Sequence, residues 1–309
     1  MSDRHVVVGA GPVGTHVARI LADRGSEVVV ATRRGTTVES SSRPIESVAL
    51  DASDADALSR LTEGAVALYN CANPSDYTTW ENVWPPIARS LRLAAERSGA
   101  VLAVVGCLYP YGPVSDGRMV EGMPDAATDH KGVLRARMWA DLKRAHDAGT
   151  LRAVEVRASD YVGVGVGANG HVTRVLPGAL QGKTAWVVDA KDQPHSFTDV
   201  LDEARALVAV ADRPETWGRI WHAPTNAPRT LEQAIIDTLA SVGKPPVRVV
   251  PVPRMLTRGL GLVVPMVREL NELSYQRTSP YILDSSFSEK ELGLTPSPWD
   301  EICRRTATV

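Results

Sequence analysis

The sequence that decides the fold is Val6-Val7-Val8-Gly9-Ala10-Gly11-Pro12-Val13-Gly14. Its three valines predict a short buried strand, and the apolar spacing after the glycines predicts an amphipathic helix. A second apolar run, at residues 28–31, predicts the next strand. The glycines at positions 9, 11 and 14 therefore match GxGxxG between a strand and a helix, which is the context that this pattern requires.

Each glycine of this turn has a physical role. Gly9 permits a tight turn, Gly11 lets the main chain approach a pyrophosphate, and Gly14 lets the helix pack closely on the strand. The free N–H groups at the helix start face the anion, and Pro12 costs little there because a first-turn N–H has no helical partner. The alternative is a glycine-rich turn that binds nothing. We predict a dinucleotide site with contacts from Gly9, Gly11, Pro12, Val13 and Gly14.

The end of the second strand bears on the choice of dinucleotide. An NAD site usually has an acidic residue there, which binds the ribose 2′-hydroxyl. This chain has Arg33 and Arg34 instead. Because a guanidinium suits a 2′-phosphate in charge and in donor geometry, we predict NADP(H) as the cofactor. The alternative is that both arginines are solvated loop residues.

Composition excludes several classes of protein. The chain has 309 residues, is 44% hydrophobic and carries a formal net charge of −2, which allows a large core and gives no sign of nucleic-acid binding. Its three cysteines, at positions 71, 107 and 303, are far apart, so we expect neither a disulfide framework nor a metal site. The apolar stretch 259–267 is too short to span a membrane. With the first strand so near the first residue, we expect no signal peptide and a cytoplasmic protein.

Strands and helices alternate over the first 160 or so residues, which predicts an α/β fold with a doubly wound parallel (Rossmann) sheet. We expect residues 1–162 to form the dinucleotide-binding domain and 163–309 to form mainly a smaller substrate-binding lobe. Segments near 195–225 are expected to return to the first domain. The further predicted strands are 46–50, 65–69, 100–105, 153–156, 185–188 and 219–222, and the predicted helices are 52–61, 80–98, 129–148, 172–180, 200–211 and 231–242.

The small residues Cys71, Ala72 and Asn73 follow the fourth predicted strand. In open α/β sheets cofactors lie outside the carboxyl ends of the strands, so we predict that these three residues contact the cofactor.

By its motifs the chain resembles the extended branch of the short-chain dehydrogenase/reductases, the epimerase/dehydratase-like group. The order and spacing of the motifs carry the resemblance. The motifs are GAGPVG (9–14), LDASDADAL (50–58), LYNCANP (68–74), CLYPYGP (107–113), VRASDYVG (156–163), HSFTDVLDEARAL (195–207) and DSSFSEKELGLTPSPWDE (284–301). The resemblance implies further cofactor contacts at Asp51, Ala52, Ala158 and Ser159, and a substrate site between the sheet edge and the C-terminal lobe.

The catalytic positions of that family are changed here. Its members use a Tyr-x-x-x-Lys pair on the helix after the fifth strand, and the alignment places Lys131 and Arg135 there, while the family's serine falls on Cys107. A lysine with a positive neighbour and partial burial gives up its proton more readily and can act as an acid or base near neutral pH. We therefore predict Lys131 as the proton donor, with Tyr109, Tyr111 and His130 as alternatives.

Other readings of these positions remain open. Lys131 could contact the ribose or lie at a solvated helix start, and Arg135 is most simply an anion contact to cofactor or substrate. Cys107 is a candidate catalytic residue by position, although free cysteines are usually buried packing residues. His195 resembles a position in the second lobe and is weighed as structural rather than functional.

Together these features predict an NADPH-dependent oxidoreductase that reduces a small carbonyl, imine or enone. The alternatives are an NADP-binding isomerase, epimerase or cyclase-like enzyme, and a cofactor-sensing protein without activity. The partner is expected to be a small-molecule substrate, with no nucleic acid and no membrane. The resemblance also implies a homodimer through helices 80–98 and 129–148.

Overall fold

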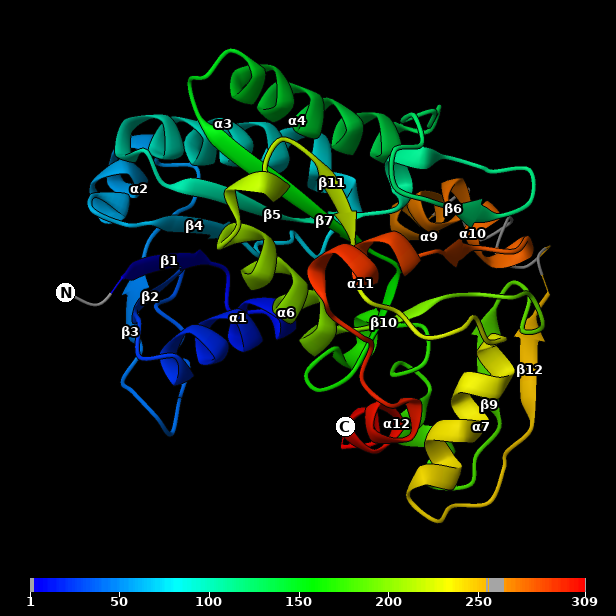
Figure 1. Ribbon diagram of the computed structural model, residues 1–309. Helices are drawn as coiled ribbons and strands as arrows, with labels where there is room; N and C mark the ends of the chain where they lie inside the picture. Colours follow the sequence, from blue (N-terminus) through cyan, green and yellow to red (C-terminus); the bar gives the residue numbers. More distant parts are fainter. Residues whose placement is uncertain (1–2, 254, 256–263, 309) are drawn as a thin grey trace.

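The computed structural model describes residues 3–253, 255 and 264–308. At its centre lies a seven-stranded sheet in which every neighbouring pair is parallel, with the order β11-β7-β5-β4-β1-β2-β3 (Figure 1). The predicted doubly wound parallel sheet is therefore confirmed. The strands are β1 (Arg4–Val8), β2 (Glu27–Thr32), β3 (Glu46–Ala49), β4 (Ala67–Asn70), β5 (Val101–Cys107), β7 (Arg152–Ala158) and β11 (Ile220–His222).

Helices cover both faces of this sheet, and the side chains of β1 alternate between the two cores. Val7 packs with α1 and α6 on one face, whereas Val6 and Val8 pack with α2, α3 and α4 on the other. A strand that is buried on both faces is apolar throughout, which explains the run of three valines. The helices are α1 (Pro12–Asp23), α2 (Ala55–Thr62), α3 (Trp80–Ser98), α4 (His130–Asp147) and α6 (Val200–Ala211).

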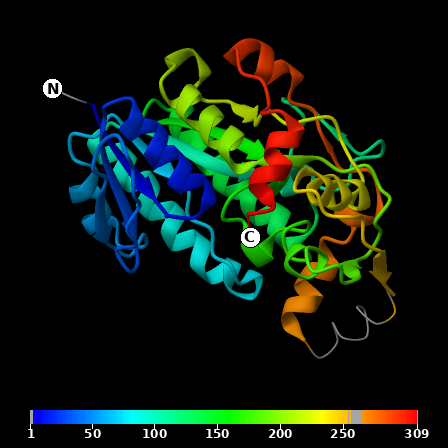
Figure 2. The same cartoon turned by 90° about the horizontal axis from the view of Figure 1, so that it is seen from below.

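A second lobe lies beside the carboxyl ends of the strands, where β8 follows β7 directly (Figure 2). It contains three two-stranded parallel pairs, β8–β10, β9–β12 and β6–β13. Its strands are β6 (Arg118–Met119), β8 (Asp160–Val162), β9 (Ala185–Val188), β10 (Phe197–Asp199), β12 (Val249–Val252) and β13 (Ile282–Leu283). Its helices are α5 (Leu176–Ala179), α7 (Leu231–Ser241), α9 (Pro265–Glu272), α10 (Tyr275–Thr278), α11 (Ser286–Leu292) and α12 (Trp299–Thr306). The 3-10 helices are η1 (Tyr77–Thr79), η2 (Tyr109–Tyr111), η3 (Gly167–Asn169) and η4 (Pro214–Thr216).

Local sequence signals explain several of the boundaries. The Asp54 carboxylate accepts hydrogen bonds from the N–H groups of the first turn of α2, and Thr230 and Gln233 form a capping box at the start of α7. The prediction of a helix over 172–180 is wrong in length, because only Leu176–Ala179 is helical. Apolar content alone does not make a helix in a segment that lacks a capping residue.

Two other predictions concern the return of the chain to the main sheet and the apolar stretch 259–267. Strand β11 pairs with β7, so the segment near residue 220 lies in the main sheet, while the domain boundary after residue 162 remains a prediction. Of the apolar stretch 259–267, residues 259–263 lie outside the described residues. None of the helices that the structure describes combines the length and the apolar character needed to cross a bilayer.

Candidate active site

The glycine turn after β1 has the geometry of a pyrophosphate cradle. Gly9 has a φ of +104°, and a Cβ atom there would lie 2.7 Å from the Cys71 carbonyl oxygen. A Cβ atom at Gly14 would lie 2.0 Å from the Gly9 carbonyl oxygen, whereas one at Gly11 would meet no described atom within 4 Å. Two of the glycines are thus required by the fold, and the third leaves open space. That is where a dinucleotide pyrophosphate would approach the main chain.

The first turn of α1 adds donors to this space. Gly11 is the N-cap residue and provides no side-chain cap, and Pro12 occupies the first turn as predicted. The N–H groups of the first helical turn have no partners within a helix, so they are available to an anion. The turn that contains Val13 and Gly14 therefore fits a bound dinucleotide.

Charged groups lie at the other end of the predicted cofactor site. Arg33 and Arg34 are exposed immediately after β2, and Asp51 is exposed after β3. Hydrogen bonds from the Ser53 N–H and hydroxyl lower the pKa of the Asp51 carboxyl, and Arg33 lowers it further through its charge. Ala52 is half-buried beside Asp51. This end of the site therefore presents two exposed guanidinium groups.

The remaining predicted contacts follow β4 and β7. Cys71 is buried, and its main chain lies against Gly9, while Ala72 and Asn73 are more exposed. Ala158, at the end of β7, is in register with Cys107 at the end of β5. The adjacent Ser159 has a buried hydroxyl oxygen without a hydrogen-bond partner in the described part of the chain. These loops therefore lie at the same edge of the sheet as the glycine turn, and their cofactor contacts remain predictions.

Lys131 lies in the first turn of α4, which Asp129 caps by accepting a hydrogen bond of 2.7 Å from the Gly132 N–H. The lysine side chain is 3% exposed, and its ammonium contacts the carboxylates of Glu269 and Glu272 in α9. The reasoning from sequence assumed a positive neighbour for Lys131. The structure corrects it, because the charged groups in contact with the ammonium are two carboxylates.

Arg135 has other partners. Its Nη2 donates a 2.7 Å hydrogen bond to the Val105 carbonyl oxygen, and its guanidinium lies 4.7 Å from the centre of a Trp84 ring. These contacts connect α4 to β5 and to α3. The predicted contact of Arg135 with an anion remains a prediction.

A pair of tyrosines lies beside Lys131. The hydroxyl groups of Tyr77 and Tyr109 are 2.9 Å apart, and Lys131 Nζ lies 5.7 Å from the centre of the Tyr77 ring. Burial raises the pKa of both tyrosines. The sequence analysis selected Tyr109 as a possible proton donor. It missed Tyr77, because the two tyrosines lie in separate 3-10 helices and no sequence spacing links them.

The other candidates have different surroundings. Burial raises the pKa of the Cys107 thiol, so it stays protonated and suits packing more than nucleophilic attack. The Tyr111 hydroxyl lies 2.8 Å from His222 Nε2 inside the protein. His130 is exposed, with its Nδ1 3.1 Å from Glu81 Oε1.

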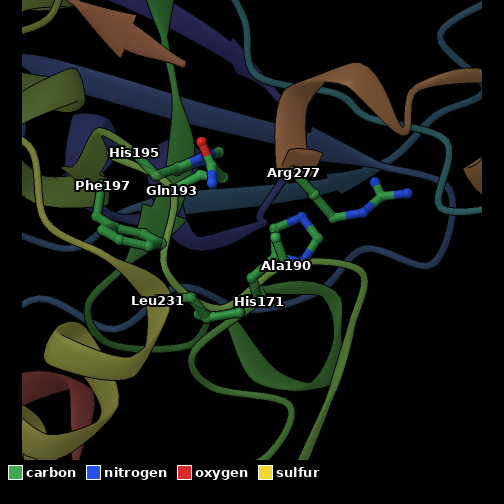
Figure 3. Close-up of a pocket in the computed structure, with 7 residues that line it drawn as sticks. All are labelled: His171, Ala190, Gln193, His195, Phe197, Leu231 and Arg277. Carbon is green, nitrogen blue, oxygen red and sulfur yellow. The ribbon is translucent and has the colours of Figure 1, made fainter. Parts of the chain in front are cut away.

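A small pocket of about 20 Å³, room for about one water molecule, lies in the second lobe, and we call it the lobe pocket (Figure 3). Asp160, at the start of β8, lies against two of its imidazoles, with Oδ2 2.7 Å from His195 Nε2 and 3.5 Å from His171 Nε2. Sequence reasoning weighed His195 as structural and overlooked His171 and Asp160. Within the described part of the chain, no three or more His, Cys, Asp or Glu side chains are arranged so that they could hold a metal ion. The residues that line the pocket are His171, Ala190, Gln193, His195, Phe197, Leu231 and Arg277.

The model of the NAD dependent epimerase/dehydratase family matches residues 5–222. Among similar solved structures, dTDP-glucose 4,6-dehydratase from Bacillus anthracis str. Ames in complex with NAD has a TM-score of 0.80 at 13% identity, over 99% of this chain and 96% of that one. UDP-N-acetylglucosamine 4-epimerase from Methanobrevibacter ruminantium M1, in complex with UDP-N-acetylmuramic acid, has a TM-score of 0.79 at 15% identity, over 99% and 98%.

A point mutant of UDP-glucuronic acid 4-epimerase from Bacillus cereus, in complex with UDP-4-deoxy-4-fluoro-glucuronic acid and NAD, has a TM-score of 0.77 at 15% identity. The match covers 98% of this chain and 98% of that one. No curated protein matches the sequence. At these identities the solved structures establish the shared fold only. The reaction has to be inferred from the residues of the site.

Proposed function

The chain belongs to the NAD dependent epimerase/dehydratase family, and from this premise we propose that it is an NADP(H)-dependent oxidoreductase that reduces a small carbonyl, imine or enone. The observation that carries the proposal is the cluster of Tyr77, Tyr109 and Lys131 at the carboxyl end of β5. A tyrosine hydroxyl beside an ammonium is the arrangement that the family forms on one helix. Here the cluster draws its tyrosines from η1 and η2.

Arg33 and Arg34 support NADP(H) over NAD(H). An acidic residue that would bind a ribose 2′-hydroxyl is absent after β2, and two exposed guanidinium groups can pair with a 2′-phosphate. The Bacillus anthracis and Bacillus cereus structures hold NAD, so the proposed preference for a 2′-phosphate rests on Arg33 and Arg34 alone.

The proposed reaction divides between the cofactor and the protein. When bound, the nicotinamide supplies a hydride to the electrophilic carbon. The Tyr109 hydroxyl donates its proton to the substrate oxygen or nitrogen and regains one from Tyr77 across their 2.9 Å contact. The Lys131 ammonium lies 5.7 Å from the centre of the Tyr77 ring and is held there by the carboxylates of Glu269 and Glu272, so it positions this tyrosine.

The tyrosine pKa values bear on the proton state of the two hydroxyl groups. Because burial raises the pKa of Tyr77 and of Tyr109, both hydroxyls keep their protons at neutral pH. A protonated hydroxyl can donate a proton to the substrate, which is the role that the proposed reduction requires.

Two other functions have an observation in their favour. The similar structures include sugar-nucleotide epimerases and dehydratases, which favours an isomerase-type reaction with a retained cofactor. The replacement of the tyrosine on α4 by Lys131 favours a cofactor-sensing protein without turnover. A homodimer through α3 and α4 and a cytoplasmic location complete the proposal.

The test measures NADPH oxidation with a panel of small carbonyls, imines and enones. Tyr109→Phe is expected to lower kcat about 10²-fold with little change in KM, which is typical of loss of a general acid. Tyr69→Phe is the matched control, because the Tyr69 hydroxyl on β4 is buried without a described partner. An unchanged kcat in Tyr109→Phe contradicts the proton-donor assignment. Tight NADPH binding without turnover of any substrate in the panel contradicts the reductase proposal and favours the sensor.

A further inference from the structure

The 3-10 helix η2 carries two tyrosines whose hydroxyl groups have different partners. The Tyr109 hydroxyl lies 2.9 Å from the Tyr77 hydroxyl in η1, and the Tyr111 hydroxyl lies 2.8 Å from His222 Nε2 in β11. In a 3-10 helix, which has three residues per turn, side chains two positions apart lie about 120° apart around the axis. A rotation of this short turn therefore displaces both hydroxyl groups together.

The partners of His222 set the position of its proton. The imidazole is fully buried, and its Nδ1 lies 2.7 Å from the Asp284 carbonyl oxygen. Glu121 is farther away, with Oε2 3.8 Å from Nδ1. A carbonyl oxygen only accepts hydrogen bonds, so Nδ1 carries the proton. Burial lowers the pKa of His222, so the ring is neutral at pH 7 and its Nε2 accepts a hydrogen bond from the Tyr111 hydroxyl.

The main chain at His222 belongs to the central sheet. His222 is in register with Arg157 where β11 pairs with β7, at one edge of the sheet (Figure 1). Its N–H also donates a 2.9 Å hydrogen bond to the Ser288 hydroxyl in α11. The hydroxyl of Tyr111 is therefore bonded to a side chain that the sheet and a helix both fix in place.

The ring of Tyr111 has a second fixed neighbour. The Arg157 guanidinium lies 4.5 Å from the ring centre and is fully buried. Its Nε donates a 2.6 Å hydrogen bond to Glu155, and its Nη1 and Nη2 donate to the Asp125 carboxylate at 2.7 Å and 3.2 Å. A buried cation that left these carboxylates would lose its charge compensation, so it keeps its position.

Main-chain contacts hold η2 from the other side. The Pro110 carbonyl oxygen accepts hydrogen bonds of 2.9 Å and 3.0 Å from the N–H groups of Ala126 and Ala127. A Cβ atom at Gly132 in α4 would lie 2.6 Å from the Tyr109 carbonyl oxygen, so α4 packs directly on the turn. These contacts fix where the turn lies, and the side-chain contacts of Tyr111 fix its orientation.

We propose that His222 and Tyr111 are positioning residues for the reduction, because their hydrogen bond orients η2 so that the Tyr109 hydroxyl stays in contact with that of Tyr77. Both ring nitrogens of His222 have partners inside the protein, so its imidazole takes no proton from the substrate. The inference rests on the proposed function for the reaction, whereas the coupling between the two hydrogen bonds is a property of the fold. Tyr111, one of the alternative proton donors expected from the sequence, thereby gains a different role.

The first experiment is a double-mutant cycle on the NADPH oxidation rate. Tyr111→Phe removes the hydroxyl and keeps the ring against Arg157. We expect it to lower kcat about tenfold with little change in KM, because a misplaced proton donor slows the chemical step. In a Tyr109→Phe background the same substitution is expected to change kcat less than about twofold, since the group that it positions is gone. A purely structural role would instead lower kcat by the same factor in both backgrounds.

Variants of His222 test the same hydrogen bond from its other end. His222→Leu removes the acceptor and is expected to lower kcat about tenfold. His222→Gln keeps an acceptor oxygen for the Tyr111 hydroxyl and is expected to recover most of that loss. Tyr69→Phe is the control, because it removes a buried hydroxyl on β4 that has no described partner. If His222→Leu does not fold, the cycle with Tyr111→Phe decides alone.

An unchanged kcat in Tyr111→Phe, or an equal loss with and without the Tyr109 hydroxyl, would overturn the proposal. If no substrate turns over, NMR of the full-length protein with ¹³C-labelled tyrosine decides, and Tyr77→Phe and Tyr109→Phe assign the two signals. We expect Tyr111→Phe to shift both signals and Tyr69→Phe to leave them in place. Unmoved signals in Tyr111→Phe would also overturn the proposal. This readout needs neither NADPH nor turnover, so failure of the reductase proposal and failure of this one are distinguishable.

Discussion

The glycine turn after β1 and the lobe pocket are two binding regions that are constructed differently. The turn is contiguous, over residues 9–14, and it works through main-chain atoms and the absence of side chains. The lobe pocket depends on side chains from positions as far apart as 171 and 277, which come from separate segments of the chain. A binding site formed by the main chain of one segment requires a particular local pattern of residues, which can be recognised in the sequence. A binding site formed by side chains from distant segments requires no such local pattern.

The largest expected effect separates the two roles of glycine in the turn. Gly14→Ala places a Cβ atom 2.0 Å from the Gly9 carbonyl oxygen and is expected to cost about 3–5 kcal/mol of unfolding free energy. Gly11→Ala meets no described atom within 4 Å, so this variant should fold normally and lose NADPH affinity. Urea unfolding and a nicotinamide fluorescence titration measure the two effects. Equal stability of both variants would contradict the close packing at Gly14.

The next prediction concerns Lys131, which depends on distant side chains as the pocket does. Lys131→Met leaves the carboxylates of Glu269 and Glu272 facing each other without a cation and is expected to destabilise the protein by about 2–3 kcal/mol. Lys143→Met removes an exposed ion pair on the same helix and should change stability by less than about 0.5 kcal/mol. Chemical unfolding of the two variants makes the comparison. Equal losses would show that the buried cluster contributes no more than a surface pair.

The sequence predicted the fold well because apolar periodicity and glycine chemistry are local. The run of Val6 to Val8 and the spacing of Gly9, Gly11 and Gly14 specify the first strand, turn and helix without any distant contact. The helix predicted over 172–180 failed because an apolar run at the edge of a lobe can also form turns.

The candidate site was predicted only in part. Tyr109 follows β5 within a motif, so it was found. Its partner Tyr77 and the carboxylates that contact Lys131 come from η1 and α9, and tertiary packing alone brings them together. Asp160 was overlooked for the same reason, since its importance comes from two imidazoles elsewhere in the chain.

A smaller effect is expected at Glu203, a buried carboxyl without a hydrogen-bond partner in the described chain. Burial raises its pKa well above the ordinary value of 4.5. Above that value the unfolded chain loses the proton and the folded chain keeps it, so stability falls as pH rises. Glu203→Leu should therefore stabilise the protein by about 1–2 kcal/mol at about pH 8 and by less at about pH 5.

Urea unfolding at both pH values measures this effect, and the exposed Glu291→Leu on α11 is the control. A gain from Glu203→Leu that does not change with pH would contradict the buried, neutral state of that carboxyl.

The smallest predicted effect tests the arginines after β2. Arg33→Ala is expected to weaken NADPH binding about tenfold and to leave NADH binding unchanged, because only NADPH carries the 2′-phosphate. Arg144→Ala, at an exposed position on α4, is the control for the loss of one positive charge. Equal weakening of both dinucleotides would show that Arg33 does not contact the 2′-phosphate.

The most direct test of the proposed function is a titration of the unmodified protein with NADPH and with NADH, followed by nicotinamide fluorescence. We predict tight binding of NADPH and weak binding of NADH, because Arg33 and Arg34 take the place of the acidic residue that favours NAD. Equal affinity for the two dinucleotides, or no binding of either, would contradict the assignment of NADP(H) and the reductase proposal that depends on it.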